Sequence, residues 1–116
     1  MNNYYLKTII LENCPYSIAA NNLLKNFNIN HKSIIINQYE KDNYKTSNIE
    51  TYPQIYLNKY NSKDNLLLGG YSDLKYVFDL FKNKKYLNQN VNLFLKKYNW
   101  WSKKAVLRLV QLINST

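Results

Sequence analysis

The chain has 116 residues, a formal net charge of +9 and one cysteine. This length suits one domain, and a single cysteine excludes an internal disulfide framework and a zinc site built from paired cysteines. No secretory signal peptide and no apolar run of bilayer length is recognisable, so we expect a soluble cytoplasmic protein without a membrane span. Nucleic acid is not a favoured partner, because nearly all of the positive charge is lysine and Arg108 is the single arginine.

The first third of the chain predicts a strand, a helix and a second strand. Residues 4–11 are rich in β-branched and aromatic side chains and have strand length. Pro15 suits the first turn of a helix, and residues 16–27 repeat apolar side chains at helical spacing. The expected buried face of this helix carries Ile18, Ala19, Leu23 and Phe27. Residues 31–36 form a short apolar run that indicates a strand.

The middle of the chain predicts two strands joined by a turn. Residues 38–50 are polar, and we expect them to carry a short helix with Tyr44 and Ile49 turned inward. Residues 52–58 alternate in polarity and predict a strand. After a polar turn, residues 66–70 predict the next strand, which ends in two glycines.

Two helical segments follow. In residues 71–83, Ser72 is the expected N-cap and Asp73 lies in the first turn. The apolar set of this helix is Leu74, Val77, Phe78 and Phe81. Residues 87–116 predict one further helix with a continuous apolar stripe. The stripe consists of Val91, Phe94, Tyr98, Trp101, Ala105, Leu109 and Leu112. The resulting order, β-α-β-α-β-β-α-α, predicts an α/β fold with a mixed sheet and a right-handed first crossover.

Three short motifs fall at the boundaries of these elements. Cys14-Pro15-Tyr16-Ser17 lies between the first strand and helix, and Thr51-Tyr52-Pro53 precedes the third strand. Gly69-Gly70-Tyr71-Ser72-Asp73 joins the fourth strand to the next helix. Together they resemble the active-site motifs of the glutaredoxins, thioredoxin-fold proteins that use glutathione, with Cys-Pro-Tyr-Ser as a monothiol-type site.

The resemblance covers roughly residues 4–87. It implies a thioredoxin-like fold in which a four-stranded mixed sheet is flanked by helices, with the C-terminal helix as an extra element. We therefore expect a glutaredoxin-like domain over residues 1–87 and a helical extension over residues 88–116 that packs on the same domain. The protein is expected to be a monomer or a weak homodimer through the C-terminal helix.

Cys14 is the candidate catalytic nucleophile. It precedes the predicted first helix, and free amide groups and the dipole at a helix N-terminus favour the thiolate that carries out thiol–disulfide exchange. The resemblance implies a cis bond between Tyr52 and Pro53, which would turn the Tyr52 backbone toward Cys14. An extended peptide such as glutathione could pair with this edge.

The third motif is the candidate site for the γ-glutamyl end of glutathione, again by resemblance. Gly70 allows a ligand to approach the backbone closely. The amides of Ser72 and Asp73, at a helix N-terminus, would take a carboxylate. The Asp73 carboxylate would take the α-amino group. We predict no metal ligands.

Ser17 stands where a second cysteine would permit an internal disulfide. Its presence predicts monothiol chemistry, in which Cys14 attacks the glutathione sulfur of a glutathionylated protein and a second glutathione resolves the intermediate. The Ser17 hydroxyl is expected to donate a weak hydrogen bond to the Cys14 sulfur. The predicted activity is therefore that of a glutathione-dependent disulfide oxidoreductase acting on protein–glutathione mixed disulfides.

Two positions depart from the family pattern. Leu11 stands where glutaredoxins usually carry a lysine or arginine, and Glu50 replaces a second base. These bases normally attract the glycine carboxylate of glutathione, so Lys7, Lys41 or Lys45 would have to substitute.

Other interpretations stay open. Paired subunits could bridge a [2Fe-2S] cluster through Cys14 and glutathione, although Pro15 and Tyr16 count against this cofactor. The chain could instead be a catalytically weak thioredoxin-fold adaptor that binds a protein partner through its tail. The apolar stripe of the tail could dock on its own domain, pair with a second chain or contact an anionic membrane surface.

Overall fold

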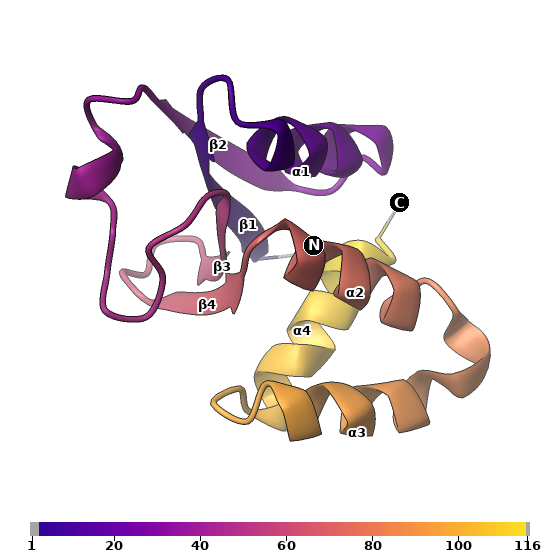
Figure 1. Cartoon of the computed structure of the whole chain (residues 1–116). Helices are drawn as coiled ribbons and strands as arrows, with labels where there is room; N and C mark the ends of the chain where they lie inside the picture. Colours follow the sequence, from indigo (N-terminus) through magenta and orange to yellow (C-terminus); the bar gives the residue numbers. More distant parts are fainter. Residues whose placement is uncertain (1–2, 116) are drawn as a thin grey trace.

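The protein forms a four-stranded sheet with four α-helices (Figure 1), described here from a computed structural model over residues 3–115. In chain order the elements are β1 (Tyr4–Leu11), α1 (Pro15–Asn26), β2 (His31–Ile36), β3 (Gln54–Lys59), β4 (Asn65–Gly69), α2 (Tyr71–Phe81), α3 (Leu87–Lys97) and α4 (Lys103–Ile113). The strand order is β2-β1-β3-β4. β1 runs parallel to β2 and antiparallel to β3, and β4 is antiparallel to β3, so the predicted mixed sheet is confirmed.

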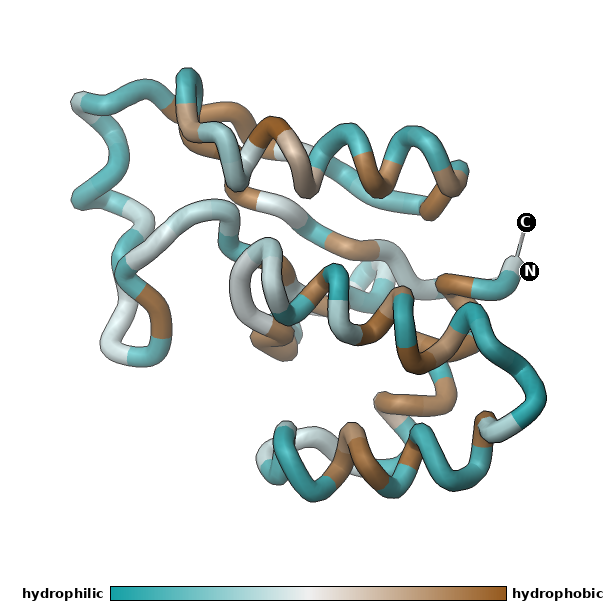
Figure 2. The backbone as a smooth tube through the Cα atoms, turned by 45° about the vertical axis from the view of Figure 1, so that its right-hand side comes forward, coloured by the Kyte–Doolittle hydropathy of each residue, from teal (hydrophilic) through white to brown (hydrophobic). Residues whose placement is uncertain are grey.

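The core lies between one face of the sheet and the helices. Leu6 of β1 pairs with Leu57 of β3, and both side chains belong to this core. The residues before and after each of them in the strand point to the other face of the sheet. The predicted apolar set of α2 is fully confirmed, because Leu74, Val77, Phe78 and Phe81 are all buried in this core. In Figure 2 hydrophobic residues recur as short bands along the helices, as is typical of amphipathic helices.

The expected buried face of α1 is only partly right: Ala19 and Leu23 are partly buried, and Leu23 packs against the core, but Ile18 and Phe27 are exposed. Ser17, Ala20 and Leu24 are the buried residues of this helix. Ile18 is half-exposed and Phe27, just beyond the helix, is 41% exposed. Hydrophobicity alone does not identify the buried face of this helix, because one of its buried residues, Ser17, is polar.

The connection between β2 and β3 is mostly irregular. The expected short helix is reduced to one 3-10 turn at Lys41–Asn43. Tyr44 and Ile49, which we expected to turn inward, are half-buried. The connection swings out on the side of the sheet away from α3 and α4 (Figure 1).

The extra C-terminal helix is in fact two helices, α3 and α4, which is a correction to the predicted single helix. Tyr98 leaves the helical conformation, and the Ser102 hydroxyl accepts a hydrogen bond from the Ala105 amide at the start of α4. The turn lets both helices place their apolar faces on one core. None of the helices in the described residues is long and apolar enough to cross a bilayer.

The predicted apolar stripe is nevertheless buried within the chain. Val91, Phe94, Tyr98, Trp101, Leu109 and Leu112 are all at most 4% exposed, and Ala105 is partly buried against them. These residues belong to the same core cluster as Leu6 of β1 and Phe78 of α2. The placement of a domain boundary near residue 87 stays a prediction.

We predict that Leu109→Ala lowers the free energy of unfolding by about 3 kcal/mol, because it removes a fully buried side chain from the core. Leu107→Ala is the matched control, since Leu107 lies on the same helix but is 43% exposed. We expect the control to change stability by less than about 0.5 kcal/mol. Urea denaturation measures both, and equal effects would show that α4 does not pack on the core.

Candidate active site

Cys14 lies in a tight turn between β1 and α1. Asn13 adopts a left-handed backbone with φ of 61°, a conformation that asparagine tolerates better than most residues. The Cys14 amide then donates to the Leu11 carbonyl at 3.3 Å. Cys14 is the N-cap residue of α1 and Pro15 is the first residue of the helix, as the sequence predicts. The thiol therefore stands at the positive end of a helix of 12 residues.

The first two motifs meet at this thiol. Cys14 Sγ lies 3.9 Å from the carbonyl oxygen of Tyr52, to which it can donate a weak hydrogen bond. The peptide bond between Tyr52 and Pro53 is cis, as expected. Pro53 is buried, whereas the Tyr52 side chain is partly exposed. The thiol thus faces a segment of backbone 38 residues away in the sequence.

The Ser17 hydroxyl does not have the expected partner. Its oxygen accepts a hydrogen bond from the Leu11 amide at 3.1 Å, and the side chain is fully buried. Among the described residues no hydrogen bond joins Ser17 to the Cys14 sulfur. One turn into α1, Ser17 faces the end of β1 and fastens the helix to the strand.

The third motif shapes the start of α2. Gly70 is the N-cap of this helix, and its amide donates to Asp73 Oδ2 at 2.9 Å. Ser72 is exposed in the first turn, so its expected role as N-cap is wrong. Gly69 has φ of 142°, and a Cβ atom there would lie 2.1 Å from Asp73 Oδ2. Only glycine fits this position beside the carboxylate.

Asp73 has a second partner that sequence reasoning missed. The Tyr98 hydroxyl donates to Asp73 Oδ1 at 2.5 Å, across 25 residues of chain. Burial of Tyr98, together with its hydrogen bond to the Asp73 carboxylate, raises the pKa of this phenol well above its usual value. The phenol of Tyr98 is the donor in this hydrogen bond. In the sequence it is one of seven residues in an apolar stripe, and nothing there marks it as a polar contact.

A cavity of about 640 Å³ lies beside these groups. It is lined by Tyr16, Asn48, Ile49, Thr51, Tyr52, residues 67–73 and Trp100. Of the predicted site residues, Tyr16, Tyr52, Gly70, Ser72 and Asp73 line this cavity. Cys14 does not line the cavity itself, but its thiol contacts the carbonyl of Tyr52, which does, and Ser17 and Pro53 are buried.

The walls of the cavity are aromatic on several sides. Tyr16 is 65% exposed and its ring lies 6.3 Å from that of Tyr71. Trp100, from the turn between α3 and α4, was not predicted to belong to the site. Its indole N–H donates to the Leu67 carbonyl at 2.9 Å, which holds the ring at the rim. The C-terminal segment therefore contributes both Tyr98 and Trp100 to this region.

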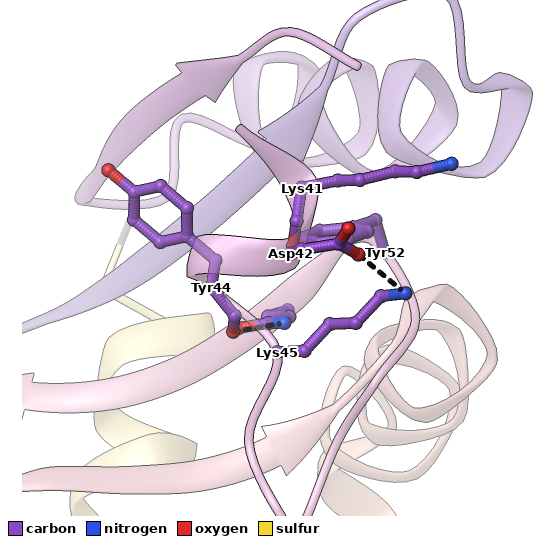
Figure 3. A network of polar contacts seen from close by, with 6 residues as sticks. Lys41, Asp42, Tyr44, Lys45 and Tyr52 are labelled. Carbon is purple, nitrogen blue, oxygen red and sulfur yellow. Dashed lines mark hydrogen bonds and ion pairs between the residues drawn. The ribbon is translucent and has the colours of Figure 1, made fainter. Parts of the chain in front are cut away.

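Two lysines of the β2–β3 connection lie near Tyr52 (Figure 3). The Tyr52 hydroxyl donates to the carbonyl oxygen of Lys41. Lys45 Nζ lies 3.0 Å from Asp42 Oδ1, and this contact lowers the pKa of Asp42 and raises the pKa of Lys45. Lys7 instead lies over the Tyr56 ring, in a separate cavity on the other face of the sheet.

Comparison with known proteins confirms the resemblance. The Glutaredoxin family model matches residues 4–60. The fold matches the crystal structure of glutaredoxin 1 from Francisella tularensis complexed with cacodylate, with 27% sequence identity and a TM-score of 0.53. That match covers 70% of this chain and 99% of the other chain. No curated protein matches the chain significantly.

The family and the fold support a thiol–disulfide oxidoreductase kind of function. Within residues 3–115 no group of three or more histidine, cysteine, aspartate or glutamate side chains is placed to hold a metal ion. The individual roles of the site residues stay predictions.

We predict that Ser17→Ala lowers the free energy of unfolding by about 1–2 kcal/mol, because the Leu11 amide loses its acceptor. Ser47→Ala, in an exposed loop, serves as the control and should change stability by less than about 0.5 kcal/mol. Thermal and urea denaturation measure the difference. A Ser17→Ala protein as stable as the control would mean that this hydrogen bond does not hold α1 against β1.

Proposed function

Because the Glutaredoxin family model matches residues 4–60, we propose that this chain is a glutathione-dependent oxidoreductase that reduces protein–glutathione mixed disulfides, with Cys14 as its nucleophile. Glutaredoxins use glutathione as a cosubstrate. The observation that carries the proposal is the position of Cys14 Sγ at the start of α1, 3.9 Å from the carbonyl of Tyr52, a residue that lines the cavity. Substrate sulfur could approach the thiol from this cavity.

The proposed reaction has two exchange steps. In the first, the Cys14 thiolate attacks the glutathione sulfur of the mixed disulfide, and the substrate protein leaves as a thiolate that takes up a proton. Glutathione is now bound to Cys14 through a disulfide. In the second, the thiolate of another glutathione attacks the glutathione sulfur of this intermediate. Oxidised glutathione leaves and the Cys14 thiolate is regenerated.

The absence of a second cysteine supports a monothiol mechanism. Cys14 is the only cysteine of the sequence, so no internal thiol can displace the bound glutathione. Ser17 occupies the resolving position and has a structural role through the Leu11 amide. The intermediate therefore waits for glutathione from solution.

The γ-glutamyl end of glutathione is proposed to bind at the start of α2. The free amides of the first turn, including those of Ser72 and Asp73, can take its carboxylate. The Asp73 carboxylate can take its α-amino group. Its two oxygens already accept from Gly70 and Tyr98, but a carboxylate has about four acceptor positions. Two positions are thus left for the ammonium group, and the existing bonds hold the carboxylate in place for it.

The glycine end requires a cation that the usual positions do not supply, since Leu11 and Glu50 stand there. Lys45 is the favoured substitute: burial raises the pKa of Tyr52, which lines the cavity, and the positive charge of Lys45 acts against this rise. Its side chain is 39% exposed and pairs with the exposed Asp42. A surface ion pair of this kind is weak, so the ammonium group can turn to a glycine carboxylate.

We predict that the protein gains one glutathione on incubation with oxidised glutathione and that Cys14→Ser gains none, as measured by mass spectrometry of the intact chain. Cys14→Ser should also lose turnover of a glutathionylated peptide, because no other thiol exists in the chain. Its thermal stability should stay close to that of the parent. Turnover near the parent rate in Cys14→Ser would refute the proposed mechanism.

A second prediction concerns the hydrogen bond from Tyr98 to Asp73. Tyr98→Phe should raise the KM for glutathione about threefold to tenfold with little change in kcat, as expected for loss of one hydrogen bond that orients a binding group. Tyr76→Phe is the control. The centre of the Tyr76 ring lies 6.1 Å from that of Tyr98, but among the described residues the hydroxyl that bonds to Asp73 is that of Tyr98. A lower melting temperature with unchanged KM would mark Tyr98 as a purely structural residue.

A further inference from the structure

A second cavity, of about 460 Å³, lies at the opposite end of the sheet from Cys14. It opens between the start of β1, the end of β3 and one side of α4. Its lining residues are Asn3, Tyr4, Lys59, Lys104, Arg108, Gln111 and Ser115. Tyr4 begins β1 and Cys14 follows its other end, so the length of the strand, roughly 20 Å or more, separates the two sites.

The lining of this cavity is cationic. Lys59, Lys104 and Arg108 carry positive charge, and none of the seven lining residues is acidic. The two ion pairs found in the described part of the chain, Lys45–Asp42 and Lys75–Asp79, lie elsewhere. The positive charge of the cavity is therefore not neutralised by any ion pair formed within residues 3–115.

The fold directs these cations to one place. Lys104, Arg108 and Gln111 lie at steps of four and three residues along α4, so they share one side of the helix. Val106, Leu109 and Ile113 face the core from its other side. Lys59, at the end of β3, brings the third cation from the sheet.

Arg108 is held in position but is not fully satisfied. Its guanidinium carbon lies 5.7 Å from the centre of the Tyr4 ring, and its Nη1 donates to Gln111 Oε1 at 3.2 Å. Its Nε is covered from solvent and has no acceptor among the described residues. A buried donor without an acceptor is unusual in proteins. A guanidinium group has five N–H donors, and an oxyanion in the cavity could accept from those that neither bond to Gln111 nor are covered.

From these observations we infer that the cavity binds a small molecule bearing phosphate groups. Arginine presents a planar set of donors that matches phosphate oxygens, and lysine adds point charges. Three cations favour a multiply charged anion over a single carboxylate. The volume is in the usual range for small-molecule sites. This inference does not depend on the thiol chemistry of Cys14.

Isothermal titration calorimetry of the full chain with sodium pyrophosphate, at constant ionic strength, tests the inference. We expect saturable binding of one pyrophosphate per chain. Lys104→Gln and Arg108→Gln should each weaken the affinity at least tenfold. Lys63→Gln, which removes one charge from the exposed β3–β4 turn, should leave the affinity within twofold of the parent.

Two further arms keep the test decisive. Circular dichroism establishes whether the variants fold. If Arg108→Gln does not fold, the affinity of Lys104→Gln decides the test. A labelled single-stranded oligonucleotide is titrated in parallel. The inference is overturned if pyrophosphate shows no saturable binding, if Lys63→Gln weakens binding as much as Lys104→Gln, or if the oligonucleotide binds more tightly than pyrophosphate and displaces it.

Discussion

The hydrogen bond from Tyr98 to Asp73 joins the C-terminal helices to the site beside Cys14. The Asp73 carboxylate is fixed from two directions, because it also accepts from the Gly70 amide at the start of α2. Burial and the hydrogen bond to Asp73 both raise the pKa of Tyr98. The tail therefore does more than add apolar core: it orients the side chain that is proposed to bind the α-amino group of glutathione.

The same segment protects the open edge of the sheet. β4 is an edge strand, and the indole N–H groups of Trp100 and Trp101 both donate to its Leu67 carbonyl. The ring of Phe94 stacks on that of Tyr98, with 4.4 Å between the ring centres, and makes a T-shaped contact with that of Trp101, with 5.2 Å between the centres. This aromatic cluster places the turn between α3 and α4 at the rim of the cavity. α4 then runs back along the start of β1, where its polar side lines the cationic cavity.

Local sequence patterns were enough to predict most of the strands and the buried face of α2, and the three motifs could be read directly from the sequence. Alternation and β-branched content place β1 and β2 at the predicted residues, and the apolar repeat of α2 matches its buried face. The juxtaposition of Cys14 with Tyr52 followed from family resemblance, since no local pattern joins residues so far apart. The apolar pattern was a weaker guide in α1, because the buried face of this helix includes the polar Ser17.

Tertiary contacts alone decided the rest. The stripe from residue 91 to residue 112 fits one long helix by spacing, but two helices bury it on a compact core, and the Ser102 cap allows the chain to turn. Ser17 bonds the Leu11 amide instead of the Cys14 sulfur because the end of β1 lies against α1. Tyr98 meets Asp73, and Arg108 meets Tyr4, only when helices and strands from opposite ends of the chain pack together. A sequence determines which residues can be buried or charged along one element, whereas contacts between elements depend on how all of them pack.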